Sequence, residues 1–179
     1  MIDLETLGTE PGAAILSIGA VAFDAQGVRE RFYVNVDALS CHKAGLQTDP
    51  ATVRWWMDQA TSNPAAVAAL RRRALRLPVA LELLAVWLRD YSPKADMDVW
   101  ANSPAFDCAL LKNAYSRVNM PLPWKYYRER DYRTIRELNR YEVILPDAHV
   151  AHDALADAEY QVKMLLAIFH DGTDSSRAA

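Results

Sequence analysis

The sequence predicts an α/β fold, in which a mixed β-sheet, an antiparallel three-stranded meander plus parallel strands, is flanked by helices. Three features of the chain predict it. Apolar and alternating runs typical of strands fill the first 36 residues, helical spacing of apolar residues begins after residue 48, and a short apolar strand returns at 98–101 between two helices. We expect a single domain over residues 1–170, followed by a small, polar, disordered tail at 171–179.

The opening residues supply the meander. Residues 1–5 are predicted to form a short strand, and a turn rich in Gly and Pro follows at 6–12. The run at 13–23 is nearly continuous in apolar residues, which favours a buried strand, and the partial alternation at 28–36 indicates a third, antiparallel strand. Because only two residues precede Asp3, we expect the start of the first strand to fray.

Helices are predicted in the rest of the chain. Pro50 suits the first turn of a helix at 51–60, whose apolar side carries Val53, Trp56 and Met57. Further helices are expected at 63–73, at 78–90, after the loop at 102–105, at about 133–141 and at about 153–169.

The composition, with 51% hydrophobic and 24% charged residues, is that of an ordinary soluble protein. No apolar run approaches the roughly 18 residues that a membrane span needs, so we expect a cytoplasmic protein without a membrane partner. The two cysteines, Cys41 and Cys108, are expected to be reduced thiols. The net charge of −3 does not suggest a general nucleic-acid binder. The basic run at 125–140 is typical of a solvated helix face, and binding of phosphates by its arginines is the alternative.

Two acidic residues, Asp3 and Glu5, stand two positions apart in the first strand and therefore share one of its faces. Neighbouring carboxylates raise each other's pKa, so such a pair shares a proton, lies in water or holds a cation. A hard divalent metal ion that takes oxygen ligands, Mg²⁺ or Mn²⁺, suits the last case. Two solvated acids near a chain terminus are the alternative.

Two further acids occupy the first turns of predicted helices. Asp107 follows the strand at 98–101, at the end of a strand where open α/β sheets place their ligands. Asp157 lies one turn into the last helix, among small residues that leave room for close packing. The helix dipole alone favours an acid at either position, so neither acid by itself identifies a site.

Together these residues resemble a known set of motifs. Asp3-x-Glu5, Phe106-Asp107 and His152-x4-Asp157 are similar in order and spacing to the three motifs of the DEDDh group of DnaQ-like, or ribonuclease-H-like, 3′–5′ exonucleases. The likeness covers nearly the whole chain and is greatest to the phage and bacterial exonuclease VIII-like, or Rv2179c-like, subgroup. The segments that carry this closer similarity are residues 3–9, 18–21, 52–56 together with Gln59, and 130–134.

The resemblance implies a ribonuclease-H-like sheet and an exonuclease that releases nucleoside 5′-monophosphates from the 3′ end of single-stranded nucleic acid. It also implies two divalent metal ions, Mg²⁺ or Mn²⁺. In the implied arrangement Asp3 contacts both ions, Glu5 and Asp157 complete one site, and Asp107 helps to hold the other.

His152 is the general base that the resemblance implies. Its unperturbed pKa lies near neutrality, which suits that role, and His149 is the alternative base. The sister DEDDy group has a tyrosine four residues before the last acid, where this chain has Asp153. The substrate-binding residues that the resemblance implies are Thr6, Leu7, Asn102, Phe106 and Arg133. Ordinary core packing is the alternative for Leu7.

Other functions remain open at this point. A non-catalytic module that binds nucleic acid or a protein partner on the same fold is one alternative, and a hydrolase of small nucleotides is another. Trp55 and Trp56 could stack on bases, but paired tryptophans in a helix are more typical of packing. The choice between RNA and DNA stays open, and resemblance to dimeric relatives favours a homodimer over a monomer.

Overall fold

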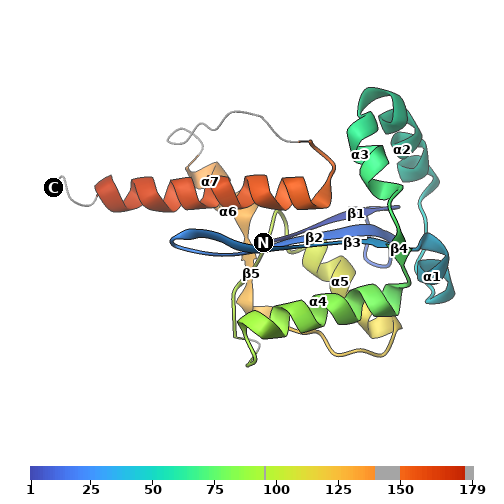
Figure 1. Cartoon of the computed structure of the whole chain (residues 1–179), viewed down its shortest axis with the longest axis horizontal. Helices are drawn as coiled ribbons and strands as arrows, with labels where there is room; N and C mark the ends of the chain where they lie inside the picture. Colours follow the sequence, from blue (N-terminus) through green and yellow to red (C-terminus); the bar gives the residue numbers. More distant parts are fainter. Residues whose placement is uncertain (95, 140–149, 176–179) are drawn as a thin grey trace.

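Six strands form one sheet in the order β4-β3-β2-β1-β5-β6 in the computed structural model, which describes residues 1–94, 96–139 and 150–175. The strands are β1 (Ile2–Thr6), β2 (Ile15–Asp24), β3 (Gly27–Val36), β4 (Ala74–Leu75), β5 (Val99–Ala101) and β6 (Glu129–Asp131). The helices are α1 (Ala38–Lys43), α2 (Pro50–Ser62), α3 (Pro64–Leu70), α4 (Leu77–Tyr91), α5 (Asp107–Arg117), α6 (Tyr132–Leu138) and α7 (Ala154–Ser175), with a 3-10 turn η1 at Tyr126–Arg128. Helices cover both faces of the sheet, so the predicted ribonuclease-H-like α/β class is confirmed (Figure 1).

The predicted meander forms the centre of the sheet. β1 pairs antiparallel with β2, and β2 pairs antiparallel with β3. Met1 continues the pairing of β1, since its carbonyl oxygen accepts a hydrogen bond from the Val21 N–H at 2.8 Å. The expected fraying is therefore not observed: the start of β1, directly before Asp3, is paired.

Short parallel strands extend the meander at both edges. β5 is parallel to β1 and β6 is parallel to β5, while β4 is parallel to β3 at the opposite edge. Neither β4 nor β6 was predicted. The helix expected at 63–73 ends at Leu70, and the basic run is more than a helix face, because it contains β6 and Arg130 forms an ion pair with Asp98 at 2.8 Å. Strands of two or three residues depend on their neighbours, which leaves little periodic pattern in the sequence.

One face of the sheet packs on α4 and α5 (Figure 1). Ile2 and Leu4 of β1 point to this side and join one large apolar core with side chains of both helices. The fully buried leucines of that core are Leu46, Leu77, Leu81, Leu84, Leu110 and Leu111. Each such side chain stabilises the fold by about 1.5–3 kcal/mol relative to its exposed state. Because strand side chains alternate, Asp3 and Glu5 point to the other face.

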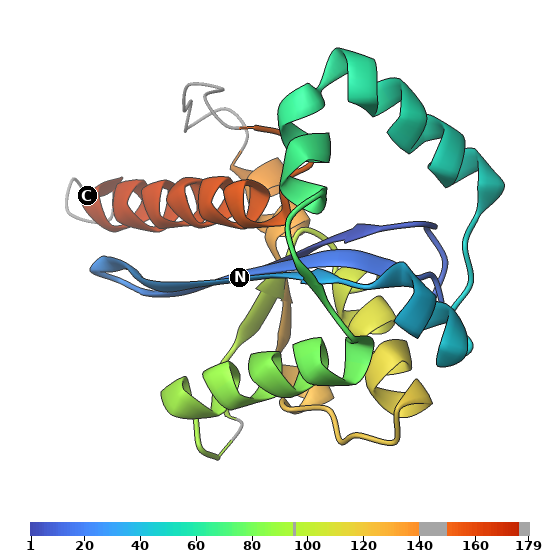
Figure 2. The same ribbon diagram turned by 45° about the vertical axis from the view of Figure 1, so that its right-hand side comes forward.

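The other face packs on α7, which lies along the sheet in both views (Figures 1 and 2). Its buried residues Ala158, Val162 and Leu165 form a second cluster with Val21 of β2 and with Tyr132 at the start of α6. α7 begins one residue later than predicted and extends past Phe169 to Ser175.

The α2–α3 pair stands beside the N-terminal end of α7 (Figure 2). Asp49 caps α2 by accepting hydrogen bonds from the backbone N–H groups of Ala51 and Thr52. The predicted apolar side of this helix is only partly correct, because Trp56 is buried whereas Met57 is 67% exposed. The short helix α1, capped by the side chain of Asp37, was not predicted.

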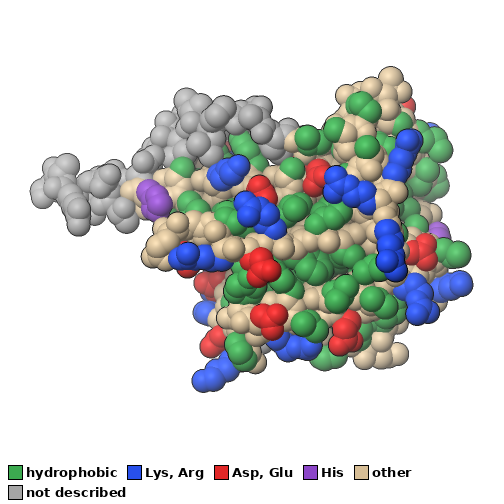
Figure 3. Space-filling view, in the orientation of Figure 1, with side chains coloured by type: hydrophobic (Ala, Val, Ile, Leu, Met, Phe, Trp, Pro, Cys, Tyr) green, Lys and Arg blue, Asp and Glu red, His purple; other side chains and the backbone are tan. Residues whose placement is uncertain are grey.

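Basic and acidic side chains are interspersed over the face shown in Figure 3, in keeping with the small net charge. Cys41 and Cys108 are both buried and free, as expected. Among the described residues no helix is long and apolar enough to cross a membrane.

Candidate active site

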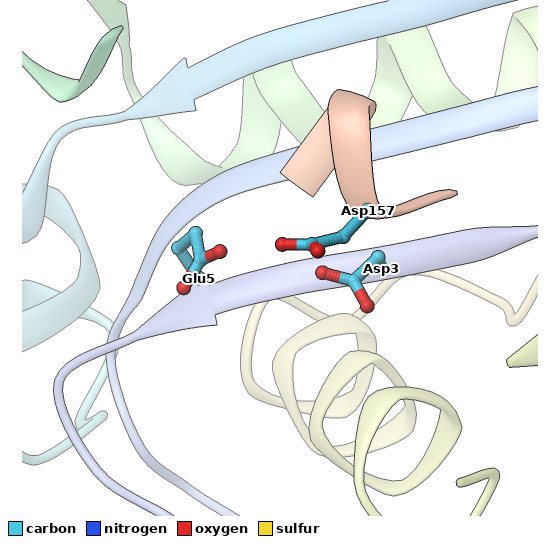
Figure 4. A group of neighbouring side chains, drawn as sticks. All are labelled: Asp3, Glu5 and Asp157. Atoms are coloured by element: carbon cyan, nitrogen blue, oxygen red, sulfur yellow. The ribbon is translucent and has the colours of Figure 1, made fainter. Parts of the chain in front are cut away.

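Three carboxylates meet where β1 passes under the first turn of α7. Asp3 and Glu5 project from one face of β1, and Asp157 projects toward them from α7 (Figure 4). One oxygen of each carboxylate can be chosen so that all three lie within 4.8 Å of one another. The structure therefore brings together residues from the two ends of the chain, as the resemblance to the exonuclease motifs implied.

Asp107 reaches the same cluster of carboxylates from α5. It is the first residue of α5, and its side chain is only 2% exposed. Its Oδ1 accepts a hydrogen bond from the backbone N–H of Leu4 at 3.2 Å, so it is attached to β1 between Asp3 and Glu5. Asp107 is not one of the three converging carboxylates, but it lines the same cavity.

Burial raises the pKa values of Asp3, Glu5 and Asp107, and repulsion between carboxylates adds to the rise at Asp3 and Glu5. The pKa of Asp3 is raised well above its usual value, first by burial and then by the charges of Asp107, Glu5 and Asp157. Burial, followed by the charge of Asp157, raises the pKa of Glu5 to about 8, and burial raises that of Asp107 to about 7. Such a cluster holds protons unless a cation compensates its charge.

Gln161 is a site residue that the sequence analysis missed. It lies four residues after Asp157 on α7, and its Nε2 donates a hydrogen bond to Asp3 Oδ1 at 2.9 Å. Its side-chain oxygen and that of Asn102 are buried without a hydrogen-bond partner among the described residues. Residues four positions apart share a helix face, so the spacing of Gln161 from Asp157 was a signal in the sequence that could have identified Gln161 as a site residue.

His152 stands just before α7 and lines the cavity with the carboxylates. Its backbone N–H donates a hydrogen bond to Asp157 Oδ2 at 2.7 Å, and its backbone is left-handed, with φ at +64°. Asp153 stands at the position where the DEDDy group has a tyrosine. Its side chain caps α7 by accepting hydrogen bonds from the backbone N–H groups of Leu155 and Ala156. The alternative base, His149, lies outside the described residues.

A cavity of about 760 Å³ opens over the carboxylates. Four of the five expected substrate-binding residues line it, namely Thr6, Asn102, Phe106 and Arg133. Leu7 is not among the lining residues and packs against the large apolar core instead.

The two tryptophans of α2 have different surroundings. Trp56 is buried, and its indole N–H donates to the carbonyl oxygen of Thr6 at 2.9 Å, which supports the expectation of packing. Trp55 is 38% exposed, and both residues line the cavity.

A comparison with protein families shows to which family the chain belongs. Residues 1–169 match the model of the 3'-5' exoribonuclease Rv2179c-like domain. The chain belongs to the Rv2179c-like family. A search of curated proteins finds no significant match. The Rv2179c-like region includes every element that carries a site residue, from β1 through the start of α5 to the first turns of α7.

A divalent cation fits the donor set of this Rv2179c-like domain. Carboxylate oxygens are the ligands that Mg²⁺ and Mn²⁺ prefer. A cation would also remove the repulsion that raises the pKa values of Asp3 and Glu5. The sequence predicted this cluster, and the structure brings its members together.

Proposed function

We propose that this chain is a metal-dependent 3′–5′ exonuclease that removes nucleoside 5′-monophosphates from the 3′ end of single-stranded RNA. The observation that carries the proposal is the convergence of Asp3, Glu5 and Asp157 within 4.8 Å, in a cavity that His152 also lines. The family description, a 3'-5' exoribonuclease domain, supports both the polarity and the choice of RNA.

Four carboxylates are proposed to hold two Mg²⁺ or Mn²⁺ ions. Asp3, Glu5 and Asp157 would hold one ion, and Asp107 together with Asp3 would hold the second. When bound, such ions supply a strong nucleophile from water and compensate the charge on the phosphoryl oxygens. Gln161 orients Asp3 through its hydrogen bond to Oδ1, as residues that hydrogen-bond to a metal ligand commonly do.

His152 is proposed to accept the proton of the attacking water. An imidazole is largely deprotonated near neutral pH and still basic enough to take that proton. The hydrogen bond from its backbone N–H to Asp157 fixes its segment relative to one of the carboxylates. The base and one of the ion-binding carboxylates, Asp157, are therefore positioned by the same turn of chain.

The remaining residues of the cavity are proposed to hold the end of the strand. Arg133 supplies the positive charge that a phosphate needs, and the ring of Phe106 offers an apolar surface to a base.

The site disfavours a purely binding module. Without cations, four carboxylates in one cavity repel the phosphates of a strand, so a binder would gain nothing from clustering them. A hydrolase of small nucleotides would use the same groups, and it is distinguished by the length of substrate that it prefers.

The polarity of cleavage tests the proposal. RNA and DNA 12-mers labelled at either end, and a dinucleotide, are incubated with the protein and Mn²⁺, and the products are separated by size. We expect 5′-labelled RNA to yield a ladder that shortens with time, 3′-labelled RNA to yield the mononucleotide at once, and His152→Ala to be slowed about 10²–10⁴-fold. Internal cleavage, or turnover of the dinucleotide alone, would overturn the proposal.

A further inference from the structure

The α2–α3 pair contacts the segment that carries His152 at two points. The first contact is between aromatic rings, because the Trp55 and His152 ring centroids lie 4.8 Å apart with an interplanar angle of 86°. This is the edge-to-face arrangement that aromatic rings prefer. The second contact is a hydrogen bond from Asn63 Nδ2 to the carbonyl oxygen of Ala151 at 2.6 Å.

Trp55 is itself held in place. Its ring packs edge-to-face on Trp56, with centroids 4.9 Å apart and an interplanar angle of 78°. Trp56 is buried and bonded through its indole N–H to the carbonyl oxygen of Thr6, the last residue of β1. A continuous set of contacts therefore runs from the end of β1, through both indole rings, to the imidazole.

The His152 segment needs such support. A non-glycine residue with φ at +64° is strained, and this conformation persists only where the surroundings impose it. The backbone is fixed by Asp157 and, one residue earlier, by Asn63. Among the described residues the imidazole makes no hydrogen bond or ion pair, and its ring contact is with Trp55.

We propose that Trp55 is a positioning residue for His152, and that its ring holds the imidazole where it can take a proton from water at the carboxylates. This inference rests on the proposed function. It assigns the α2–α3 pair a part in the reaction: α2 carries the ring that orients the base, and Asn63, at the junction with α3, anchors the backbone beside it.

A different role for Trp55 makes a different prediction. Its ring is 38% exposed and lines the cavity, so it could stack on a base of the substrate. A stacking residue contributes to substrate binding and its loss raises KM, whereas a residue that orients the base acts in the chemical step and its loss lowers kcat.

Steady-state kinetics on a 5′-labelled RNA oligomer with Mn²⁺ separate these roles. We expect Trp55→Ala to lower kcat roughly tenfold with little change in KM, as the loss of one aromatic pair implies, and Trp55→Phe to restore most of the rate. In a His152→Ala background, Trp55→Ala should cause no further loss. Met57→Ala, at an exposed position of the same helix, is the matched control and should behave as the wild type.

An effect of Trp55→Ala that is confined to KM, or that is equally large in the His152→Ala background, would overturn the proposal. Proton NMR provides a readout independent of activity, because the Trp55 ring should shift the His152 ring resonances, which His152→Ala identifies. These resonances should move in Trp55→Ala and stay in place in Met57→Ala, and unmoved resonances would refute the contact. A wild type that shows this contact but cleaves no RNA would instead overturn the proposed function, and the catalytic role of Trp55 with it.

Discussion

The backbone of Gly19 in β2 lies directly against the backbone carbonyl group of Ala154, the first residue of α7. A Cβ atom at this position would overlap the Ala154 carbonyl and the following amide nitrogen, which are backbone atoms that cannot rotate away. The contact sets the height of α7 above the sheet one turn before Asp157. The position of Asp157 over Asp3 and Glu5 therefore depends on the absence of a side chain at residue 19.

Replacing Gly19 by alanine should displace α7 and damage both stability and activity. We expect a loss of about 1–3 kcal/mol in the free energy of unfolding, as for other overpacked sites, measured by urea denaturation. Gly27→Ala is the comparison, because nothing lies within 4 Å of a Cβ there and its cost comes only from the positive φ. Equal activity of the folded Gly19→Ala and Gly27→Ala proteins would refute the link between this contact and the site.

The metal-free protein should become less stable as the pH rises. Glu5 and Asp107 hold their protons more tightly in the folded chain, with pKa values of about 8 and about 7 against ordinary values of 4.5 and 3.8. At a pH between its ordinary and its raised pKa, each carboxyl is protonated in the folded chain and ionised in the unfolded chain. The folded chain therefore binds more protons, and the free energy of unfolding falls with increasing pH. In EDTA, we expect a lower Tm at pH 8 than at pH 6, and a larger gain from Mn²⁺ at pH 8.

The amine of Met1 opposes this trend, because burial lowers its pKa to about 5. Glu5→Gln keeps that amine and removes one carboxylate, so its Tm in EDTA should fall less between pH 6 and pH 8. If the slope of Tm against pH is the same in Glu5→Gln as in the wild type, Glu5 does not carry the shifted pKa.

Removing the charge of Arg133 should weaken RNA binding. We expect Arg133→Ala to raise KM about tenfold, the effect of losing one charge-assisted contact to a phosphate. The slope of log KM against log salt concentration should also fall by about 0.7, the value for one phosphate contact on a single strand. Arg136→Ala is the control on the same helix, because Arg136 pairs with Glu137 and does not line the cavity. The same change in salt dependence in both variants would contradict a specific contact at Arg133.

Trp56→Phe should destabilise the protein. The indole N–H of Trp56 is the donor to the carbonyl oxygen of Thr6, and its loss leaves that buried acceptor without its partner. We expect a loss of about 1–3 kcal/mol in the free energy of unfolding, measured in urea. Trp55→Phe, at a partly exposed ring without such a bond, should change stability much less, and a reversed order would contradict these assignments.

One part of the site could be predicted from a short-range regularity of the sequence, and the rest from the resemblance to known motifs. The two-residue period of a strand places Asp3 and Glu5 on one face. The resemblance to the exonuclease motifs implied that Asp107, His152 and Asp157 lie beside them, and all five residues line one cavity. Long helices with strong patterns were predicted best. α4 agrees with its predicted range to one residue at each end, and α7 agrees to one residue at its start but extends beyond its predicted end.

The features that were missed depend on tertiary neighbours. β4 forms by pairing with β3 and β6 by pairing with β5, and their two or three residues show no period of their own. Trp55 and Trp56 are adjacent and identical in type, so only the folded chain separates a buried ring from one that contacts His152. The contact of Leu7 with substrate stays a prediction, and its partly buried side chain packs against the core.

The dependence of RNA cleavage on Mn²⁺ in the wild type and in Asp3→Asn tests the central claim most directly. An amide at residue 3 keeps the size of the side chain and an oxygen that can accept from Gln161, but it removes the charge that both proposed ion sites share. We predict that the wild-type rate is zero in EDTA and saturates with Mn²⁺, and that Asp3→Asn, although folded, cleaves no RNA at any Mn²⁺ concentration. Cleavage by the wild type in EDTA, or wild-type rates in Asp3→Asn, would contradict the account.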